Sequence, residues 1–565
     1  MNRRLQWIKL LFVGWFLFLV IRLFYWQVIK NPELEKDARA QYGSSDIIPA
    51  PRGEIRSADG FPLVTNSQKY LAFIDPHVFR LDADISKKLF DLLPATSGAQ
   101  KIITENRGLP LNWLPIAHGL SPDTKARIEQ LQVPGLGFEE EQDRIYPEGS
   151  PSAYFTGFVG KNETGDMQGY FGLEGYWDRI LSGKPGKLNQ QLDAYNRPIV
   201  IGDQNIIPPQ PGQNLITSVD RSVEYIVFKQ LEAGLVKYQA KSGTVTVMDS
   251  KTGHLLAMVS LPGYDPGHFT DYPPDIYKNP IVSEGYEPGS TFKTIVMSSA
   301  LDAGAVTPQT ICEICSGPVQ ISGDYLRSYN NVYYPGCNMS DVILHSDNIG
   351  MVFVSRKLGK EKMLAYIRKF GFGQLTGVDL QEESTPVLRP DNQWYDIDWA
   401  TAAFGQGIAV TRLQMVTAVN AIANGGQLIP PRVAIGTEVD GKIKLFPPVK
   451  AKKVISAEAA ALMTRMMVNA VNHGEVRYYR VPGFSVAAKT GTAQIPIAGH
   501  YDPDKFIASF IGFAPAANPK FTMLVTLNHP QSSPWGSTTA APLWFGIAEK
   551  LFRYFQIPPD SSALH

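Results

Sequence analysis

The chain begins with an uninterrupted hydrophobic run. Residues 10–21 are all apolar, and apolar residues resume after Arg22 and continue to Ile29. About 20 apolar residues span a bilayer as a helix, so residues 8–29 predict a membrane anchor. The basic residues of the first nine positions predict a cytoplasmic tail at residues 1–7 and an extracytoplasmic remainder. A cleaved signal peptide is the alternative, although no small-x-small cleavage motif follows.

The pattern changes beyond the Pro-rich linker at residues 208–212, where apolar positions predict alternating helices and strands. Within residues 222–238, four-residue steps give one apolar stripe, which predicts a helix and consists of Val223, Val227, Leu231 and Leu235. Lys251-Thr252-Gly253 joins two short apolar runs and predicts a β-hairpin turn. Further strands are predicted at residues 486–495, 506–513 and 521–527, and a last helix at residues 538–555.

Length and charge limit the classes of function. A chain of 565 residues exceeds one ordinary domain. Lys plus Arg and Asp plus Glu are each 53, so no basic surplus indicates a nucleic-acid partner. Residues 30–50 are polar and predict a stalk, and residues 61–212 mix short apolar strands with many Gly and Pro residues. The region 30–212 lacks a nucleophile–base pair or metal-ligand spacing, which indicates a non-catalytic spacer and docking domain.

Ser290 and Lys293 form the Ser-x-x-Lys tetrapeptide of this chain. Pro288 and Gly289 precede it, and the apolar residues that follow predict a buried helix. Residues three apart share a helix face, and a lysine in apolar surroundings loses proton affinity and can act as a base. An activated serine nucleophile is therefore predicted; an ordinary helix start with a solvated lysine is the alternative.

Two more motifs follow in order, Ser346-Asp347-Asn348 and Lys489-Thr490-Gly491-Thr492. With Ser290 and Lys293 they resemble the signature of penicillin-binding proteins and serine β-lactamases. The resemblance implies an α+β fold in which residues 213–565 form a transpeptidase-like domain with a central antiparallel sheet flanked by helices. It also implies that residues 30–212 are a pedestal domain of the dimerisation type. A second Lys-Thr-Gly at residue 251 and Ser328-Tyr329-Asn330 are interpreted as structural.

The resemblance assigns catalytic roles. Ser290 attacks a D-Ala-D-Ala peptide bond, Lys293 takes its proton, and Ser346 relays a proton to the leaving amine with help from Lys489. The backbone amides of Ser290 and Thr492 form the oxyanion hole. No cofactor and no metal are implied.

Substrate binding is assigned by the same resemblance. Asn348 holds the peptide amide of the substrate, and Lys489 and the hydroxyls of Thr490 and Thr492 meet its terminal carboxylate. Gly491 is expected to let an incoming strand-like substrate approach closely.

The resemblance is to the class B, monofunctional penicillin-binding proteins, because anchor and pedestal are present and no glycosyltransferase region is recognisable. The implied function is crosslinking of peptidoglycan stem peptides in septal or lateral wall synthesis, with β-lactams as inhibitors. A division-type role is preferred over an elongation-type role from stretches such as Tyr286-Glu287-Pro288-Gly289. The alternatives are a D,D-carboxypeptidase or β-lactamase-type hydrolase, and a non-catalytic β-lactam sensor or division scaffold. A membrane glycan polymerase of the shape, elongation, division and sporulation (SEDS) type is the implied partner.

Three cysteines, Cys312, Cys315 and Cys337, precede His345. Paired cysteines outside the cytoplasm usually form disulfides, and we expect a disulfide that includes Cys337. Free buried thiols and a Cys₃His zinc site with His345 are the alternatives.

Overall fold

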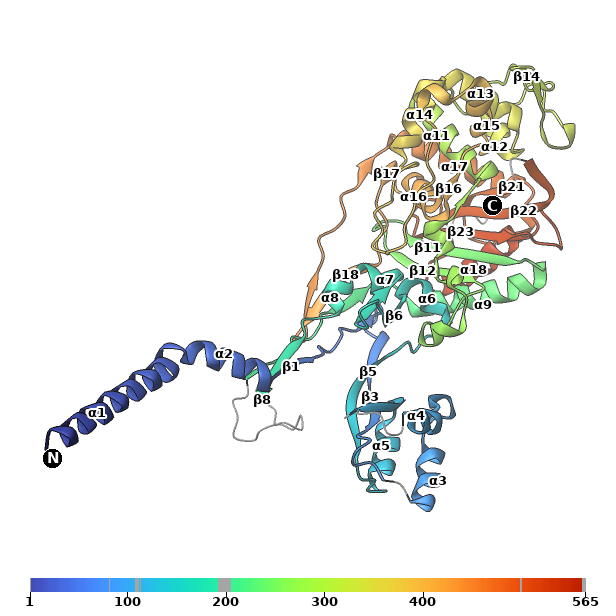
Figure 1. Ribbon diagram of the computed structural model, residues 1–565. Helices are drawn as coiled ribbons and strands as arrows, with labels where there is room; N and C mark the ends of the chain where they lie inside the picture. Colours follow the sequence, from blue (N-terminus) through green and yellow to red (C-terminus); the bar gives the residue numbers. More distant parts are fainter. Residues whose placement is uncertain are drawn as a thin grey trace. The chain divides into compact units, whose positions relative to one another are not determined.

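The computed structural model describes residues 2–80, 82–106, 111, 113–191, 205–497 and 500–560. They form two compact units, residues 1–52 with 182–212 and residues 53–181 with 213–565 (Figure 1). In the first unit, helix α1 (Asn2–Phe24) continues through a π-helical turn (Tyr25–Ile29) and is followed by α2 (Asn31–Tyr42). An antiparallel sheet completes the unit in the order β1 (Gly43–Ile48), β8 (Gly186–Gln191) and β9 (Asn205–Ile207).

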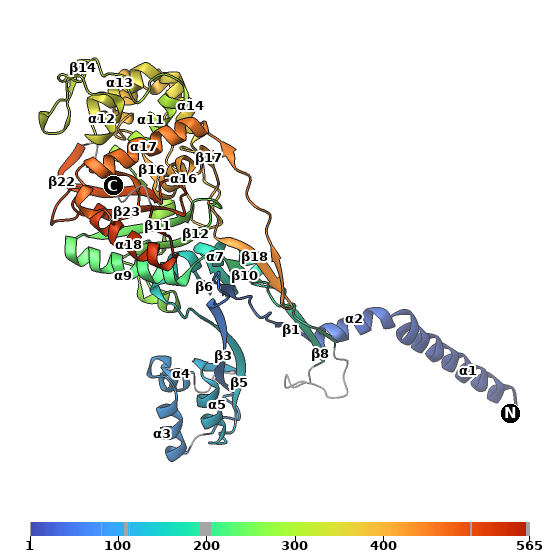
Figure 2. The same cartoon turned by 180° about the vertical axis from the view of Figure 1, so that it is seen from behind.

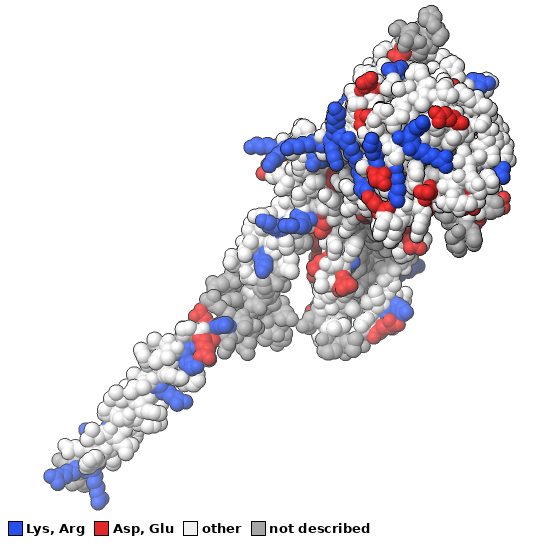
Figure 3. Space-filling view, turned by 90° about the horizontal axis from the view of Figure 1, so that it is seen from above, with Lys and Arg blue, Asp and Glu red and all other residues white. Residues whose placement is uncertain are grey.

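The N-terminal helix matches the predicted anchor. In the described part of the chain, Arg3–Ile29 is the one helix long and apolar enough to cross a membrane. Its large apolar side chains are exposed to the surroundings, as for Trp7 at 73% and Leu11 at 73%. Figure 3 shows basic side chains gathered at the free end of this helix. The expected spanning segment therefore forms one nearly continuous helix with a lipid-compatible surface.

A long sheet runs through the N-terminal part of the second unit (Figure 2). Its strand order is β19-β18-β10-β2-β3-β4, and β5 also pairs with β3. The strands are β2 (Ile55–Arg56), β3 (Pro62–Ile74), β4 (Leu114–Leu120), β5 (Leu136–Ile145), β10 (Asn214–Thr217), β18 (Ala434–Val439) and β19 (Lys442–Leu445). Helices α3 (Ala83–Leu92), α4 (Ala99–Glu105) and α5 (Pro122–Glu129) pack with β3 and β4 around a small core of their own. Strand pairing through β10 ties residues 53–145 to the C-terminal part of the chain.

A buried ion pair holds the base of this pedestal together. Arg144 lies 2.7 Å from the carboxylate of Glu174, and both side chains are almost fully buried. The guanidinium also donates to the backbone oxygen of Gly53 at 2.7 Å and to Asn66 at 2.6 Å. A Cβ at Gly53 would lie 2.0 Å from the backbone oxygen of Gln213, so only glycine fits there.

The C-terminal part is built on a five-stranded antiparallel sheet in the order β12-β11-β23-β22-β21. The strands are β11 (Ser242–Asp249), β12 (Leu255–Leu261), β21 (Ala487–Ile497), β22 (His500–Ala514) and β23 (Phe521–Asn528). Both faces of the sheet are buried, because side chains alternate between two cores. Phe510 and Val525 pack with α9 (Arg221–Tyr238) and α18 (Ala540–Tyr554) on one face. Ile511 and Leu524 face the larger core on the other.

In that larger core lie the longer helices between β12 and β21, two of which begin at the motif residues Lys293 and Asn348. They are α11 (Lys293–Asp302), α12 (Met339–Leu344), α13 (Asn348–Leu358), α14 (Lys360–Lys369), α15 (Asp396–Ala402), α16 (Arg412–Ala423) and α17 (Ala457–His473). Smaller elements are α6 (Ala153–Thr156), β6 (Phe158–Lys161), β7 (Met167–Tyr170), α7 (Gly172–Tyr176), α8 (Asp178–Leu181), α10 (Pro280–Ser283), β13 (Gly285–Tyr286), β14 (Val319–Ile321), β15 (Asp324–Leu326), β16 (Val410–Thr411), β17 (Gln427–Leu428) and β20 (Lys452–Lys453). The predicted central antiparallel sheet with helices on its faces is confirmed, as are the hairpin at Lys251 and the first and last helices.

Candidate active site

Ser290 lies in a single 3₁₀ turn, Gly289–Phe292, which leads directly into α11. Gly289 has a positive φ of 54° and donates its N–H to the backbone oxygen of Gly405 at 3.1 Å. A Cβ at Gly405 would lie 2.1 Å from the backbone oxygen of Gly289, so the two glycine backbones touch. This close contact fixes the turn that presents Ser290, whose side chain is partly exposed.

Lys293 is the first residue of α11 and is completely buried. Its amine donates hydrogen bonds to the side-chain oxygen of Asn348 at 2.7 Å, to the hydroxyl of Ser346 at 3.2 Å and to the backbone oxygen of Ser346. Burial, and then the nearby charge of Lys489, hold the pKa of Lys293 well below its usual value. The first and second sequence motifs therefore meet at this amine, which retains a neutral form suited to accept a proton.

Ser346 lies between α12 and α13 with a positive φ of 55°. The next residue, Asp347, is buried and caps α13 by accepting a hydrogen bond from the amide of Ile349 at 3.0 Å. The hydroxyl of Ser328 donates to the same carboxylate. Ser328 thus contacts the second motif through Asp347, and the interpretation of Ser328-Tyr329-Asn330 as a structural segment is confirmed.

Lys489 projects from β21 toward the same hydroxyl. Its amine lies 3.0 Å from Oγ of Ser346 and 3.2 Å from Oγ1 of Thr490. Burial lowers the pKa of Lys489 to about 8, and the charge of Glu475 acts in the opposite direction. The hydroxyl of Ser346 is therefore held between two buried amines from two different elements.

Gly491 has a packing role that the sequence did not indicate. A Cβ at this position would lie 2.3 Å from the hydroxyl of Ser509, 2.8 Å from the side chain of Thr291 and 3.1 Å from the backbone oxygen of Pro288. The absence of a side chain lets β21 pack against the Ser290 turn, and any substituent would collide with the protein itself. Thr492 lies beside the same turn, and its hydroxyl accepts a hydrogen bond from the amide of Gly536 at 3.0 Å.

The chain matches known proteins over nearly its whole length. Residues 243–552 match the penicillin binding protein transpeptidase domain, and residues 47–217 match the penicillin-binding protein dimerisation domain. The chain belongs to the class B penicillin-binding proteins. Stage V sporulation protein D of Bacillus subtilis is 33% identical over 548 residues, which are 96% of this chain and 84% of that protein.

Two further proteins are similar to this chain over most of their length, and one of them is named as a peptidoglycan D,D-transpeptidase. Peptidoglycan D,D-transpeptidase FtsI of Escherichia coli is 29% identical over 553 residues, covering 96% of this chain and 90% of that protein. The crystal structure of penicillin binding protein 3 of Mycobacterium tuberculosis, complexed with aztreonam, has a TM-score of 0.71 and 26% identity. It covers 92% of this chain and 99% of its own. The predicted family, fold and enzyme class, a peptidoglycan D,D-transpeptidase, are confirmed.

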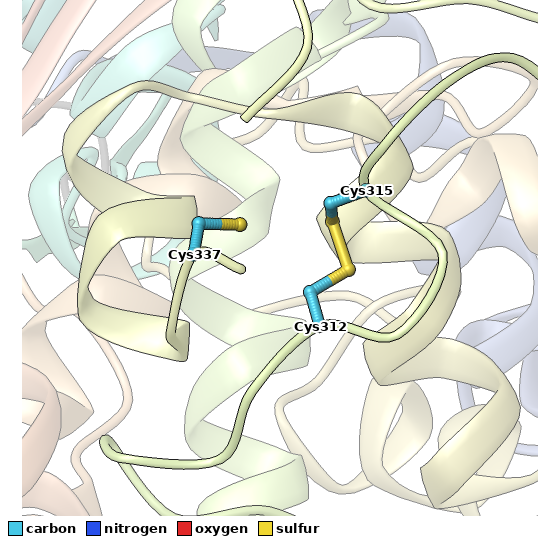
Figure 4. Close-up of side chains that lie close together, drawn as sticks. All are labelled: Cys312, Cys315 and Cys337. Atoms are coloured by element: carbon cyan, nitrogen blue, oxygen red, sulfur yellow. A yellow bond between two sulfur atoms is a disulfide. The ribbon is translucent and has the colours of Figure 1, made fainter. Parts of the chain in front are cut away.

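The expected cysteine pairing of this penicillin-binding protein is wrong. Cys312 and Cys315 form the disulfide, and Cys337 is a buried free thiol (Figure 4). The three sulfur atoms lie within 4.8 Å of one another. His345 stacks its ring on Tyr334 at 4.0 Å between centroids, away from a ligand role. Burial raises the pKa of Cys337 to about 11.

Sequence reasoning missed two long-range hydrogen bonds to Glu287, which lies three residues before Ser290 in this penicillin-binding protein. The carboxylate of Glu287 accepts hydrogen bonds from the amide of Gly407 at 3.0 Å and from the hydroxyl of Tyr501 at 3.1 Å. Burial raises the pKa of Glu287, and these two hydrogen bonds oppose that rise. Gly407 and Tyr501 lie 120 and 214 positions from Glu287. The Gly-x-Gly at residues 405–407 was the sequence feature that could have indicated a close backbone contact here.

Proposed function

We propose that this chain crosslinks peptidoglycan stem peptides through an acyl-enzyme formed on Ser290. The observation that carries the proposal is the convergence of Lys293 and Lys489 on the hydroxyl of Ser346, at 3.2 and 3.0 Å. Three motifs separated by more than 50 residues meet beside a nucleophile at the start of a helix, where unpaired amides favour negative charge. β-Lactams acylate the same serine because they resemble the D-Ala-D-Ala end of the substrate.

Acylation begins with Lys293. Its neutral amine takes the proton of Ser290 as the oxygen attacks the carbonyl carbon of the penultimate D-Ala. The amides of Ser290 and Thr492 stabilise the oxyanion, at roughly 3–4 kcal/mol per donor. Ser346, between the two lysines, passes a proton to the departing amine of the last D-Ala. An amine of a neighbouring stem peptide then attacks the ester, and Ser290 regains its proton.

Binding of the donor peptide follows from the remaining motif residues. Asn348 holds a peptide amide of the donor, and Lys489 with the hydroxyls of Thr490 and Thr492 holds its terminal carboxylate. Gly491 keeps β21 against the Ser290 turn. Because β21 pairs with β22 alone among the described strands, its other edge offers amides and carbonyls to an extended peptide.

The rest of the chain places this chemistry at the membrane. Residues 1–7 are the cytoplasmic tail, residues 8–29 the single anchor of the inner membrane, residues 30–212 the extracytoplasmic pedestal and residues 213–565 the transpeptidase domain. The basic residues before the anchor support this orientation.

We assign the chain a role in division, with a SEDS-type glycan polymerase as partner of the anchor and pedestal. Replacing residues 8–29 by an unrelated membrane helix would then preserve penicillin binding and abolish function in cells, and full complementation would contradict the partner.

The deciding experiment is replacement of the nucleophile. Ser290→Ala is expected to abolish covalent labelling by a fluorescent penicillin while the circular dichroism spectrum is unchanged, since a hydroxyl at a helix start contributes only about 1 kcal/mol. Ser86→Ala, in pedestal helix α3, is the matched control and should label normally. A folded Ser290→Ala protein that still forms the adduct would show that the nucleophile is misassigned.

A further inference from the structure

A cleft of about 300 Å³ opens beside the first residues of β21. Ser346, Lys489 and Thr490 form its inner end. Its walls include the stacked rings of Tyr334 and His345, and the segment that follows α17. The cleft is therefore continuous with the catalytic groups and extends away from them.

The position of the cleft relates it to the leaving group. This step rests on the proposed function, in which Lys489 and Thr490 hold the carboxylate of the departing D-Ala. Those two residues line the cleft, so it begins where the donor peptide ends. At about 300 Å³ the cleft is far larger than the methyl group of D-Ala needs. The acceptor amine must attack the acyl carbonyl from the side that the leaving amine has vacated, which is the side of the cleft.

The charges in the cleft have both signs. Glu475 is exposed on the wall, and its charge reaches Lys489, whose pKa it raises against the effect of burial. Arg477 lines the same wall, and its guanidinium donates to the backbone oxygen of Gly474 and to the hydroxyl of Tyr478. The other titratable groups of the lining are Tyr334, His345, His473 and Lys489. A ligand with an ammonium and a carboxylate close together matches this arrangement better than a ligand of one sign.

We propose that this cleft is the acceptor subsite, and that it binds an amine carried on a carbon that also bears a carboxylate. Glu475 attracts the ammonium as the acceptor enters, and Arg477 pairs with its carboxylate. The ammonium loses one proton to solvent in the open cleft, and the neutral amine attacks the acyl carbon. The C–N bond forms, the bond to Oγ of Ser290 breaks, and the amine proton returns to that oxygen through Ser346. Glu475 and Arg477 are binding residues in this scheme and take no part in acylation.

The test separates acceptor binding from acyl-enzyme formation. The full chain in detergent is given a D-alanyl thioester donor, whose released thiol reports acylation, and one of three acceptors. D-Alanine carries both charges, D-alaninamide carries only the ammonium, and hydroxylamine is uncharged at neutral pH. Products of transfer and of hydrolysis are separated by chromatography.

Glu475→Gln is expected to raise the half-saturating concentration of D-alanine and D-alaninamide about 10-fold, with hydroxylamine unaffected. Arg477→Gln should raise that of D-alanine alone. Because the charge of Glu475 also acts on Lys489, acceptor binding in Glu475→Gln is read from the ratio of transfer to hydrolysis for each thiol released. Thiol release should be unchanged in Arg477→Gln, and Glu458→Gln, in the first turn of α17, should behave as the parent. Unchanged transfer to D-alanine in Glu475→Gln would overturn the subsite, and unchanged transfer in Arg477→Gln would overturn its carboxylate half. Absence of thiol release from the parent chain would instead contradict the proposed acyl-enzyme.

Discussion

The amine of Lys293 donates a hydrogen bond of 2.7 Å to the side-chain oxygen of Asn348. This bond joins the first helix of the site to the second motif and orients the proposed base. Leaving a buried donor such as this amine without its acceptor costs about 1–3 kcal/mol. Asn348→Ala should therefore slow acylation by a reporter penicillin about 10- to 100-fold in stopped-flow measurements. Asn469→Ala, on α17, is the control, and an Asn348→Ala protein that acylates at the parent rate would contradict this role.

Lys489 should make stability depend on pH. Its pKa is lowered from 10.5 to about 8 by burial, so the unfolded chain binds the proton more tightly than the folded chain between these values. The free energy of unfolding must therefore rise as pH increases from 8 to 10.5, whereas at lower pH the full penalty of burying the charge is present. Between pH 7.5 and 9.5 the rise from this group is about 2 kcal/mol.

Lys489→Met should lack that contribution. Urea unfolding of parent and variant at the two pH values should give a difference in stability, in favour of the variant, that shrinks by about 2 kcal/mol at the higher pH. A difference that is the same at both pH values would show that the lysine is not perturbed. The variant should also acylate poorly, because Ser346 loses its second amine.

Gly491→Ala tests the packing of β21 on the Ser290 turn. The added methyl group has no space between Ser509, Thr291 and Pro288. Overpacking of this kind costs about 1–3 kcal/mol, and the displaced turn should slow acylation as well. Gly317→Ala is the matched control, because no atom lies within 4 Å of its Cβ position. Thermal unfolding and penicillin labelling measure the two effects, and normal values for both in Gly491→Ala would refute the explanation.

The cysteine pairing predicts a specific result in mass spectrometry. Alkylation of the unfolded, unreduced chain should modify Cys337 alone, and a peptide linked through Cys312 and Cys315 should remain. Because that bridge closes a loop of only a few residues, its loss in Cys315→Ser should cost only about 2 kcal/mol. Cys337→Ser should leave the bridge intact. A linked peptide that contains Cys337 would restore the pairing expected from the sequence.

The proposed catalytic residues could be named from the sequence because their chemistry fixes short spacings. Ser290 and Lys293 are three residues apart, and the hydroxyl, amine and amide of the other motifs occur in a fixed order. The contacts that hold them are not local. Glu287 meets Tyr501 from 214 positions away, and Gly289 meets Gly405 through backbone atoms alone. Nothing in a local pattern encodes such contacts.

The same limit explains the correction of the cysteine pairing and the unforeseen packing role of Gly491. Three cysteines define three pairings, and the choice between Cys315 and Cys337 depends on how the loop between α11 and α12 folds back. For Gly491, the sequence indicated that a side chain was excluded, whereas only the packed structure identified the Ser290 turn as the excluding neighbour.

The open edge of β21 has a cost beyond catalysis. An unpaired strand edge is a template for any extended chain, and proteins usually blunt such edges against self-association. Here the edge beside Ser290 cannot be covered without closing the site. The unacylated protein therefore exposes an unpaired strand edge beside Ser290, and this edge favours self-association. An acylating inhibitor that occupies the edge should act as a solubilising ligand, keeping concentrated protein monomeric in light scattering where the unliganded chain self-associates.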